Sequence, residues 1–187
     1  MEQGGNPTIQ VPPGRYPVTV TLADLSGQAD GSHTREAYAT IVLSPNAEAT
    51  RRPLPLLQPG EPAPNLAEGE FIGFGADAGT ACFVDDDALV TAMPDADEWN
   101  DAVFANDEEE DWFSRMDDPD HIRKGIANIP LPLATDGANI ILIHSGWGDG
   151  TNPVVGGYDA AGNLVRVHID FLVLVGADPA PPAEPTA

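Results

Sequence analysis

The apolar residues of this chain are gathered into short segments, which limits the fold to short strands and helices. The longest apolar stretches include residues 140–143 and 171–177, far short of the roughly 20 residues that a transmembrane helix needs. With 42% hydrophobic residues among 187, the chain can still bury the core of one globular domain, or at most of two small ones. We therefore expect a folded chain without a membrane span.

Strand-like patterns account for most of these segments. Residues 16–22 alternate between apolar and polar side chains, and residues 38–43 are the expected hairpin partner. Residues 71–75 and 80–84 flank a short turn in which Gly79 can adopt a positive φ. This arrangement predicts a second hairpin.

Three further strands are predicted toward the end of the chain, at residues 139–144, 153–158 and 164–175. Short glycine-containing loops connect them, which is typical of an antiparallel meander. The strands and one or two short helices together predict an α+β fold, mainly antiparallel β, in a sheet or sandwich-like arrangement.

Proline content and the chain ends indicate the domain bounds. Five prolines make residues 52–65 an extended connection that can form neither a helix nor a central strand. We expect a flexible N-terminus at residues 1–10 and a single globular domain at residues 11–176 that contains this connection. Residues 177–187 are rich in proline and alanine and are predicted to be a disordered tail.

Negative charge is concentrated in one region. The chain has 30 acidic and 8 basic residues, a formal net charge of −22. Half of the acidic residues lie within residues 85–120, where only Arg115 opposes them. Because such a surface repels phosphate, we expect neither nucleic acid nor an anionic membrane as a partner. A basic protein, cations or simple adaptation to salt remain as explanations.

The acidic region also carries a helical pattern. Its apolar residues fit an interrupted helical stripe, and Asp97 is a plausible N-cap. The run of like charges at residues 106–111 disfavours a continuous helix. We expect a short helix, a solvated acidic loop and then another helical turn.

Several short phrases follow one another along the chain: Pro-Pro-Gly-Arg-Tyr-Pro-Val (12–18), Gly-Phe-Gly-Ala-Asp-Ala-Gly-Thr-Ala-Cys-Phe-Val-Asp (73–85), Ser-Gly-Trp-Gly-Asp-Gly (145–150), Gly-Tyr-Asp-Ala-Ala-Gly (157–162) and Ile-Asp-Phe (169–171). Taken in this order, they resemble the bacterial family known as domain of unknown function 4241. The resemblance implies a shared fold and carries no activity with it. Asn152 stands where an aromatic residue is expected, and residues 107–111 look like a local elaboration.

A small-ligand or divalent-cation site is one functional hypothesis. Several carboxylates lie beside predicted turns or strand ends, and carboxylate oxygens suit Ca²⁺ or Mg²⁺. Their simpler role is to accept hydrogen bonds from their own turn backbones. No cofactor is predicted apart from such a cation. The candidate ligands are Asp77, Asp85, Asp149, Asp170 and His144.

The strand at residues 164–175 gives one of these carboxylates a specific setting. Arg166, His168 and Asp170 share one face of the alternating strand, and that face continues into apolar residues. A carboxylate that enters a buried layer needs a charged or hydrogen-bonded partner. We expect a structural ion pair of Asp170 with Arg166 or His168 in preference to a ligand site.

Nucleophilic catalysis finds little support in the sequence. Cys82 lies between apolar residues on a predicted strand, which is typical of a buried and inert thiol. Ser145 lacks the Gly-x-Ser-x-Gly context of a nucleophile elbow.

We therefore expect a cytoplasmic, non-enzymatic binding protein that engages a basic protein partner, as an immunity or inhibitor protein does. Carboxylates would steer association, and exposed tryptophans would act as anchors. The alternative is a small-ligand or metal-dependent protein, with hydrolysis as one use. The candidate partner-binding residues are Asp107, Glu108, Glu109, Glu110, Asp111, Trp99, Trp112 and Trp147.

Overall fold

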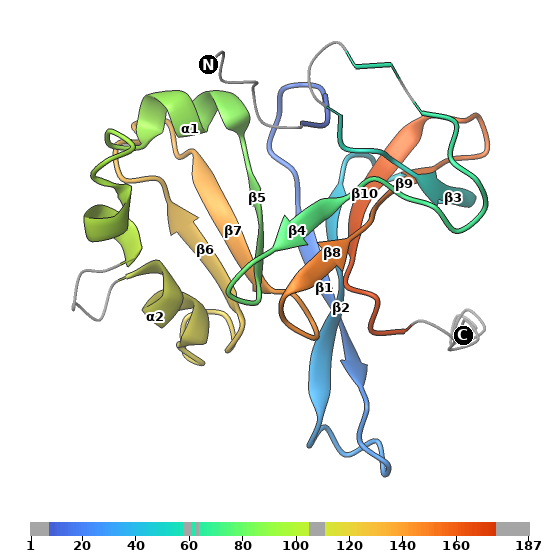
Figure 1. Cartoon of the computed structure of the whole chain (residues 1–187), viewed down its shortest axis with the longest axis horizontal. Coiled ribbons are helices and arrows are strands. Elements are labelled where there is room, and N and C mark those ends of the chain that lie inside the picture. Colours follow the sequence, from blue (N-terminus) through green and yellow to red (C-terminus); the bar gives the residue numbers. More distant parts are fainter. Residues whose placement is uncertain (1–7, 58–60, 63, 105–110, 175–187) are drawn as a thin grey trace.

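The structure is a computed structural model that describes residues 8–57, 61–62, 64–104 and 111–174 (Figure 1). Within them the chain forms ten strands, two α-helices and one π-helix. The strands are β1 (Val18–Asp24), β2 (Thr34–Val42), β3 (Thr50–Pro53), β4 (Phe74–Ala76), β5 (Thr80–Val84), β6 (Ile126–Pro130), β7 (Asn139–His144), β8 (Gly150–Asn152), β9 (Val154–Tyr158) and β10 (Leu164–Asp170). The helices are α1 (Asp86–Ala92), the π-helix η1 (Asn100–Phe104) and α2 (Trp112–Asp117).

The strands form three antiparallel sheets, which confirms the predicted α+β fold of mainly antiparallel β. One sheet has five strands in the order β1-β2-β10-β9-β3, a second has three in the order β5-β7-β6, and β4 pairs with β8. The pairing of β1 with β2 confirms the first predicted hairpin. β3 brings Pro53 to a sheet edge, as expected for a proline in the connection at residues 52–65.

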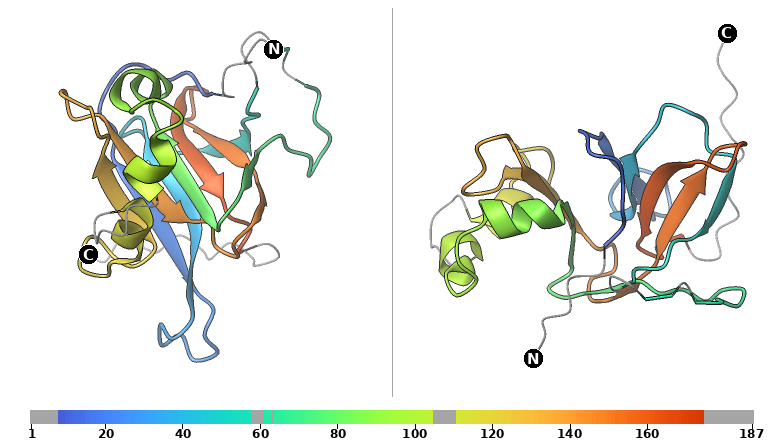
Figure 2. Two further views of the ribbon diagram at one scale, coloured as in Figure 1. Left: turned by 60° about the vertical axis from the view of Figure 1, so that its left-hand side comes forward. Right: turned by 90° about the horizontal axis from the view of Figure 1, so that it is seen from above.

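β7 lies between two hydrophobic cores. Ile140 and Leu142 belong to a core that α1, η1 and α2 cover. Ile141 and Ile143 point the other way, into a core shared with the five-stranded sheet. Figures 1 and 2 show the helices on the side of the three-stranded sheet that faces away from the five-stranded sheet. The result is a layer of helices, a small sheet and a larger sheet.

The helices are short because polar caps and loops interrupt them. Asp85 begins α1 by accepting a hydrogen bond from the Ala88 amide at 2.9 Å, and Asp111 begins α2 by accepting one from the Ser114 amide at 2.7 Å. η1 and α2 bear out the expected helical segments on either side of residues 106–111, whereas α1 was not predicted. Across the described residues, no helix is long or apolar enough to cross a membrane.

Two predicted strand pairings are wrong. β4 and β5 do not form a hairpin with one another, because β4 pairs with β8 while β5 pairs with β7. β7 does not join a meander with β9 and β10 either. The apolar residues of β7 alternate between two cores, so the strand must be buried on both faces. It therefore lies at the centre of the three-stranded sheet, between β5 and β6.

Two smaller observations concern the chain ends and Asn152 of β8. Thr8 forms a bridge with Leu57, while residues 1–7 and the predicted tail at residues 177–187 lie outside the described residues. Asn152, which replaces an expected aromatic residue, is buried in β8. Within the described structure its amide nitrogen has no hydrogen-bond partner.

The approach of Gly73 to β8 generates a stability prediction. An added Cβ at Gly73 would overlap the backbone carbonyl of Asn152, whereas one at Gly75 would meet nothing within 4 Å. We expect Gly73→Ala to lower the free energy of unfolding by about 1–3 kcal/mol, because backbone atoms would have to move. The matched Gly75→Ala change should stay within about 0.5 kcal/mol of the unmodified protein. Urea denaturation followed by tryptophan fluorescence measures both, and equal stability of the two variants would contradict the packing.

Candidate functional site

The glycine-rich loop between β7 and β8 is held firmly in place. The Ser145 amide donates to the Gly79 carbonyl at 2.8 Å, and the Ser145 hydroxyl donates to the Gly148 carbonyl at 2.7 Å. Only 2% of Ser145 is exposed. The serine hydroxyl is therefore used to shape the loop and is not presented as a nucleophile.

At Gly146 this loop packs closely against the five-stranded sheet. Gly146 has φ +63°, and an added Cβ would lie 2.7 Å from Val173 Cγ2 and 2.9 Å from the Glu36 carbonyl oxygen. Glycine is required on both grounds, because the conformation is left-handed and the space is filled. The loop is thus seated directly against β2.

A cavity of about 320 Å³ lies where this loop, the turn before β5 and β2 meet. Its lining comes from Arg35 and Glu36 of β2, from Ala78 and Gly79, and from residues 144–148. The register of β1 against β2 shifts so that Ala37 is an extra residue in β2. The bulge breaks the alternation of side chains at Ala37, so Glu36 and Ala37 are both buried. Arg35 and Glu36 both line the cavity.

The two charged side chains of the cavity differ in their contacts. Glu36 is 7% exposed, and no donor among the described residues forms a hydrogen bond with its carboxylate. The Arg35 guanidinium donates to the Thr34 carbonyl at 3.1 Å and lies 5.7 Å from the centre of the Trp147 ring. Trp147 is 59% exposed, and the ring of His33 meets it edge-on at 6.2 Å.

His144 forms the side of the cavity nearest to α2. Its Nε2 lies 3.4 Å from Asp117 Oδ1. An added Cβ at Gly125 would lie 2.8 Å from His144 Nδ1 and 3.1 Å from Glu36 Oε1, so both groups flank this glycine. The cavity therefore brings a carboxylate and an imidazole to the same spot.

The predicted metal ligands do not form one centre. Asp149 Oδ1 accepts from the Gly79 amide and Asp77 Oδ1 from the Ala78 amide, as turn-forming carboxylates do. Asp85 is the α1 cap. In the part of the chain that the structure describes, no group of three or more His, Cys, Asp or Glu side chains could hold a metal ion.

Asp170, the last residue of β10, does not line that cavity. Its carboxylate accepts from the Leu172 amide at 2.8 Å, and burial raises its pKa. The predicted ion pair of Asp170 with Arg166 or His168 is wrong, because neither forms a salt bridge with it among the described residues. His168 Nε2 instead lies 2.7 Å from Glu48 Oε2. Arg166 donates to the Ser44 and Val165 carbonyls.

His168 belongs to a buried polar cluster on the five-stranded sheet. Its Nδ1 lies 2.8 Å from Thr40 Oγ1, and Glu48, its partner at Nε2, also pairs with Arg51. Burial lowers the pKa of His168. Burial alone would raise the pKa of Glu48, but the hydrogen bonds from Arg51 and His168 hold it below its usual value. The contacts satisfy one another, which is the mark of a structural cluster.

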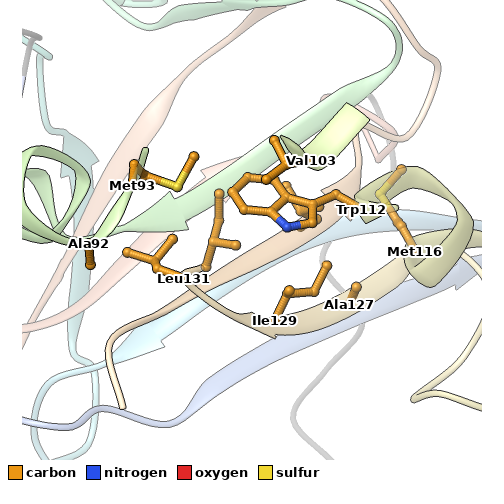
Figure 3. Close-up of a cluster of buried hydrophobic side chains, with 10 residues drawn as sticks. Ala92, Met93, Val103, Trp112, Met116, Ala127, Ile129 and Leu131 are labelled. Atoms are coloured by element: carbon orange, nitrogen blue, oxygen red, sulfur yellow. The ribbon is translucent and has the colours of Figure 1, made fainter. Parts of the chain in front are cut away.

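The predicted partner-binding residues fall into different settings. Trp112 is 6% exposed, and Figure 3 shows its ring among Val103, Ile129 and Leu131, so its prediction as an exposed anchor is wrong. Trp99 is half-buried and donates to the Pro94 carbonyl at 2.7 Å. Trp147 is exposed as predicted. Asp111 caps α2, and Asp107 to Glu110 lie outside the described residues.

Sequence reasoning found part of the cavity and missed the rest. It named His144 and Trp147, but not Arg35, Glu36 or Asp117. No local signal marks Ala37 as an extra residue in β2, or places Arg35 and Glu36 beside the loop after β7. Cys82 is another correction, because its side chain is exposed on the edge strand β5.

The fold and the site define a small α+β protein in which a glycine-lined cavity lies between the five-stranded sheet and the loops that flank the three-stranded sheet. The chain belongs to the family described as Protein of unknown function (DUF4241), whose sequence profile matches residues 2–169. This confirms the resemblance found in the short phrases. Comparison with curated proteins and with solved structures finds no match.

The buried histidine generates a prediction about pH. Because burial lowers the pKa of His168 in the folded chain, the unfolded chain takes up a proton first as the pH falls below about 6.5. We expect the free energy of unfolding to fall between about pH 7.5 and about pH 5.5, and His168→Gln to reduce this dependence. Chemical denaturation at the two pH values measures it. His33→Gln, at an exposed position, is the control that should retain the full dependence.

Proposed function

We propose that this chain is a non-enzymatic binding module that engages a basic protein partner, in the manner of an immunity or inhibitor protein. The observation that supports this most is the acidic outer surface of the helical layer. Exposed carboxylates follow one another from α1 through η1, at Asp86, Asp87, Asp95, Asp97, Glu98 and Asp101. Residues 85–104 contain no lysine or arginine.

Electrostatics explains what such a layer can do. A surface of one sign raises the rate at which an oppositely charged protein associates, and it disfavours partners of the same sign. The chain's net charge of −22 acts in the same direction over longer distances. A basic protein is therefore the class of partner that this surface selects.

Exposed apolar side chains lie on the same layer. Val90 of α1 is 81% exposed, and Phe104 of η1 is 36% exposed. Apolar contacts supply binding energy that long-range charge does not, and they lower the dissociation rate. The helical layer thus combines the two features that a protein-binding surface needs.

Neutralising the outer carboxylates tests this proposal. The triple variant Asp95→Asn, Asp97→Asn, Glu98→Gln removes three exposed charges without touching the helix caps Asp85 and Asp111. We expect it to slow association with the basic partner by about fivefold or more at low salt, and by less at about 0.5 M salt. Affinity capture from a lysate of the native cells identifies the partner, and stopped-flow mixing then gives the rates.

A charge-matched control separates position from net charge. The variant Glu61→Gln, Glu68→Gln, Glu70→Gln removes three exposed charges from the connection before β4. It should associate nearly as fast as the unmodified protein. If no basic protein is captured at low salt, or if both triple variants behave alike, the helical layer is not the binding surface.

A further inference from the structure

Glu36 brings to the cavity beside Trp147 a carboxylate that no described residue pairs with. Its oxygens are not among the fully buried, unpartnered polar atoms of the described chain, so they stay open to the cavity. Glu36 is 7% exposed and faces the cavity, and within the described chain no donor forms a hydrogen bond with its carboxylate. The cavity therefore favours an incoming group that carries positive charge and N–H donors.

The neighbouring charged residues do not meet this need. Arg35 adjoins Glu36 in sequence, but its guanidinium is directed over Trp147 and donates to the Thr34 carbonyl. His144 directs Nε2 toward Asp117, at 3.4 Å, and no described contact joins it to Glu36. A guest in the cavity would therefore find the Glu36 carboxylate without a protein partner.

The mouth of the cavity suits a flat cation. Trp147 is 59% exposed, and its indole already receives one guanidinium, that of Arg35, at 5.7 Å. The face of an indole ring attracts cations, and arginine more often than lysine. A second guanidinium could pack against the same ring system while its N–H groups reach inward.

The size of the cavity limits the guest. A volume of about 320 Å³ is at the lower end of the range for ligand pockets, enough for one long side chain. The acidic surface around the molecule raises the local concentration of cationic groups.

From these observations we infer that the cavity receives an arginine side chain of the basic partner, with Glu36 as the counter-ion and Trp147 as the stacking surface. The inference rests on the proposed function and names one contact of that partner. Binding would exchange a carboxylate without hydrogen bonds for a charge-assisted pair, which is among the stronger hydrogen-bonded contacts in proteins.

A blocked peptide tests the inference without the partner. The probe is acetyl-Gly-Arg-Gly-amide, and the control peptide carries citrulline, which has a similar shape without the charge. Titration of the labelled protein is followed by ¹H–¹⁵N NMR. We expect the arginine peptide to shift the Trp147 indole N–H and the amides of residues 145–148, and the citrulline peptide to bind about tenfold more weakly.

Variants assign the contact to Glu36. Glu36→Gln should weaken binding of the arginine peptide by about fivefold or more, while Glu68→Gln, at an exposed position in the connection before β4, should leave it unchanged. Trp147→Leu, at an exposed position that tolerates change, should also weaken it, which keeps the test valid if Glu36→Gln fails to fold. Equal shifts with both peptides, or unchanged affinity in the Glu36 and Trp147 variants, would overturn the inference.

The two proposals can fail separately. If the triple variant at Asp95, Asp97 and Glu98 slows association with the basic partner while the peptide does not bind at the cavity, the inference fails and the proposed function stands. If the peptide binds through Glu36 but no basic partner is captured, the proposed function fails and the cavity retains its guanidinium preference. In both cases the peptide titration alone decides the cavity contact.

Discussion

The structure depends on β7 being buried on both faces. Ile140 and Leu142 close the core beneath the helices, while Ile141 and Ile143 close the core against the five-stranded sheet. Four consecutive apolar residues can do this only in a strand, where successive side chains point in opposite directions. Because β7 belongs to both cores, the loop that follows it emerges at their junction, and there it forms one wall of the cavity.

Glu48, which is half-buried, and Glu36, which is buried, have different surroundings. Glu48 pairs with Arg51 and His168, and its carboxylate lies in space that only a glycine at position 157 leaves open. Glu36 is buried to a similar degree as the other polar core residues, but it has no hydrogen bond from the described residues. A satisfied cluster stabilises a fold, whereas an unsatisfied carboxylate in a cavity is suited to a ligand.

The acidic residues are also not equivalent. Asp85 and Asp111 begin helices, and hydrogen bonds from Asn163 and Asn46 hold the pKa of Asp159 at about 2. These carboxylates have local structural partners, so they are poor choices for variants meant to test long-range charge. The exposed carboxylates between α1 and η1 are the ones that project charge into solvent.

Local sequence patterns determined the elements of this protein, and tertiary structure decided how they pair. Strand-like patterns predicted β1, β2, β4, β5, β7, β9 and β10, and the prolines predicted an extended connection at residues 52–65, because both signals act within a few residues. Partner choice depends on distant residues, so the pairing of β4 with β8 and of β5 with β7 could not be predicted locally. The same holds for the site. Trp147 and His144 could be named from a glycine-rich phrase, whereas Glu36 joins them only because the loop at Gly146 packs against β2, which is a tertiary contact between distant residues.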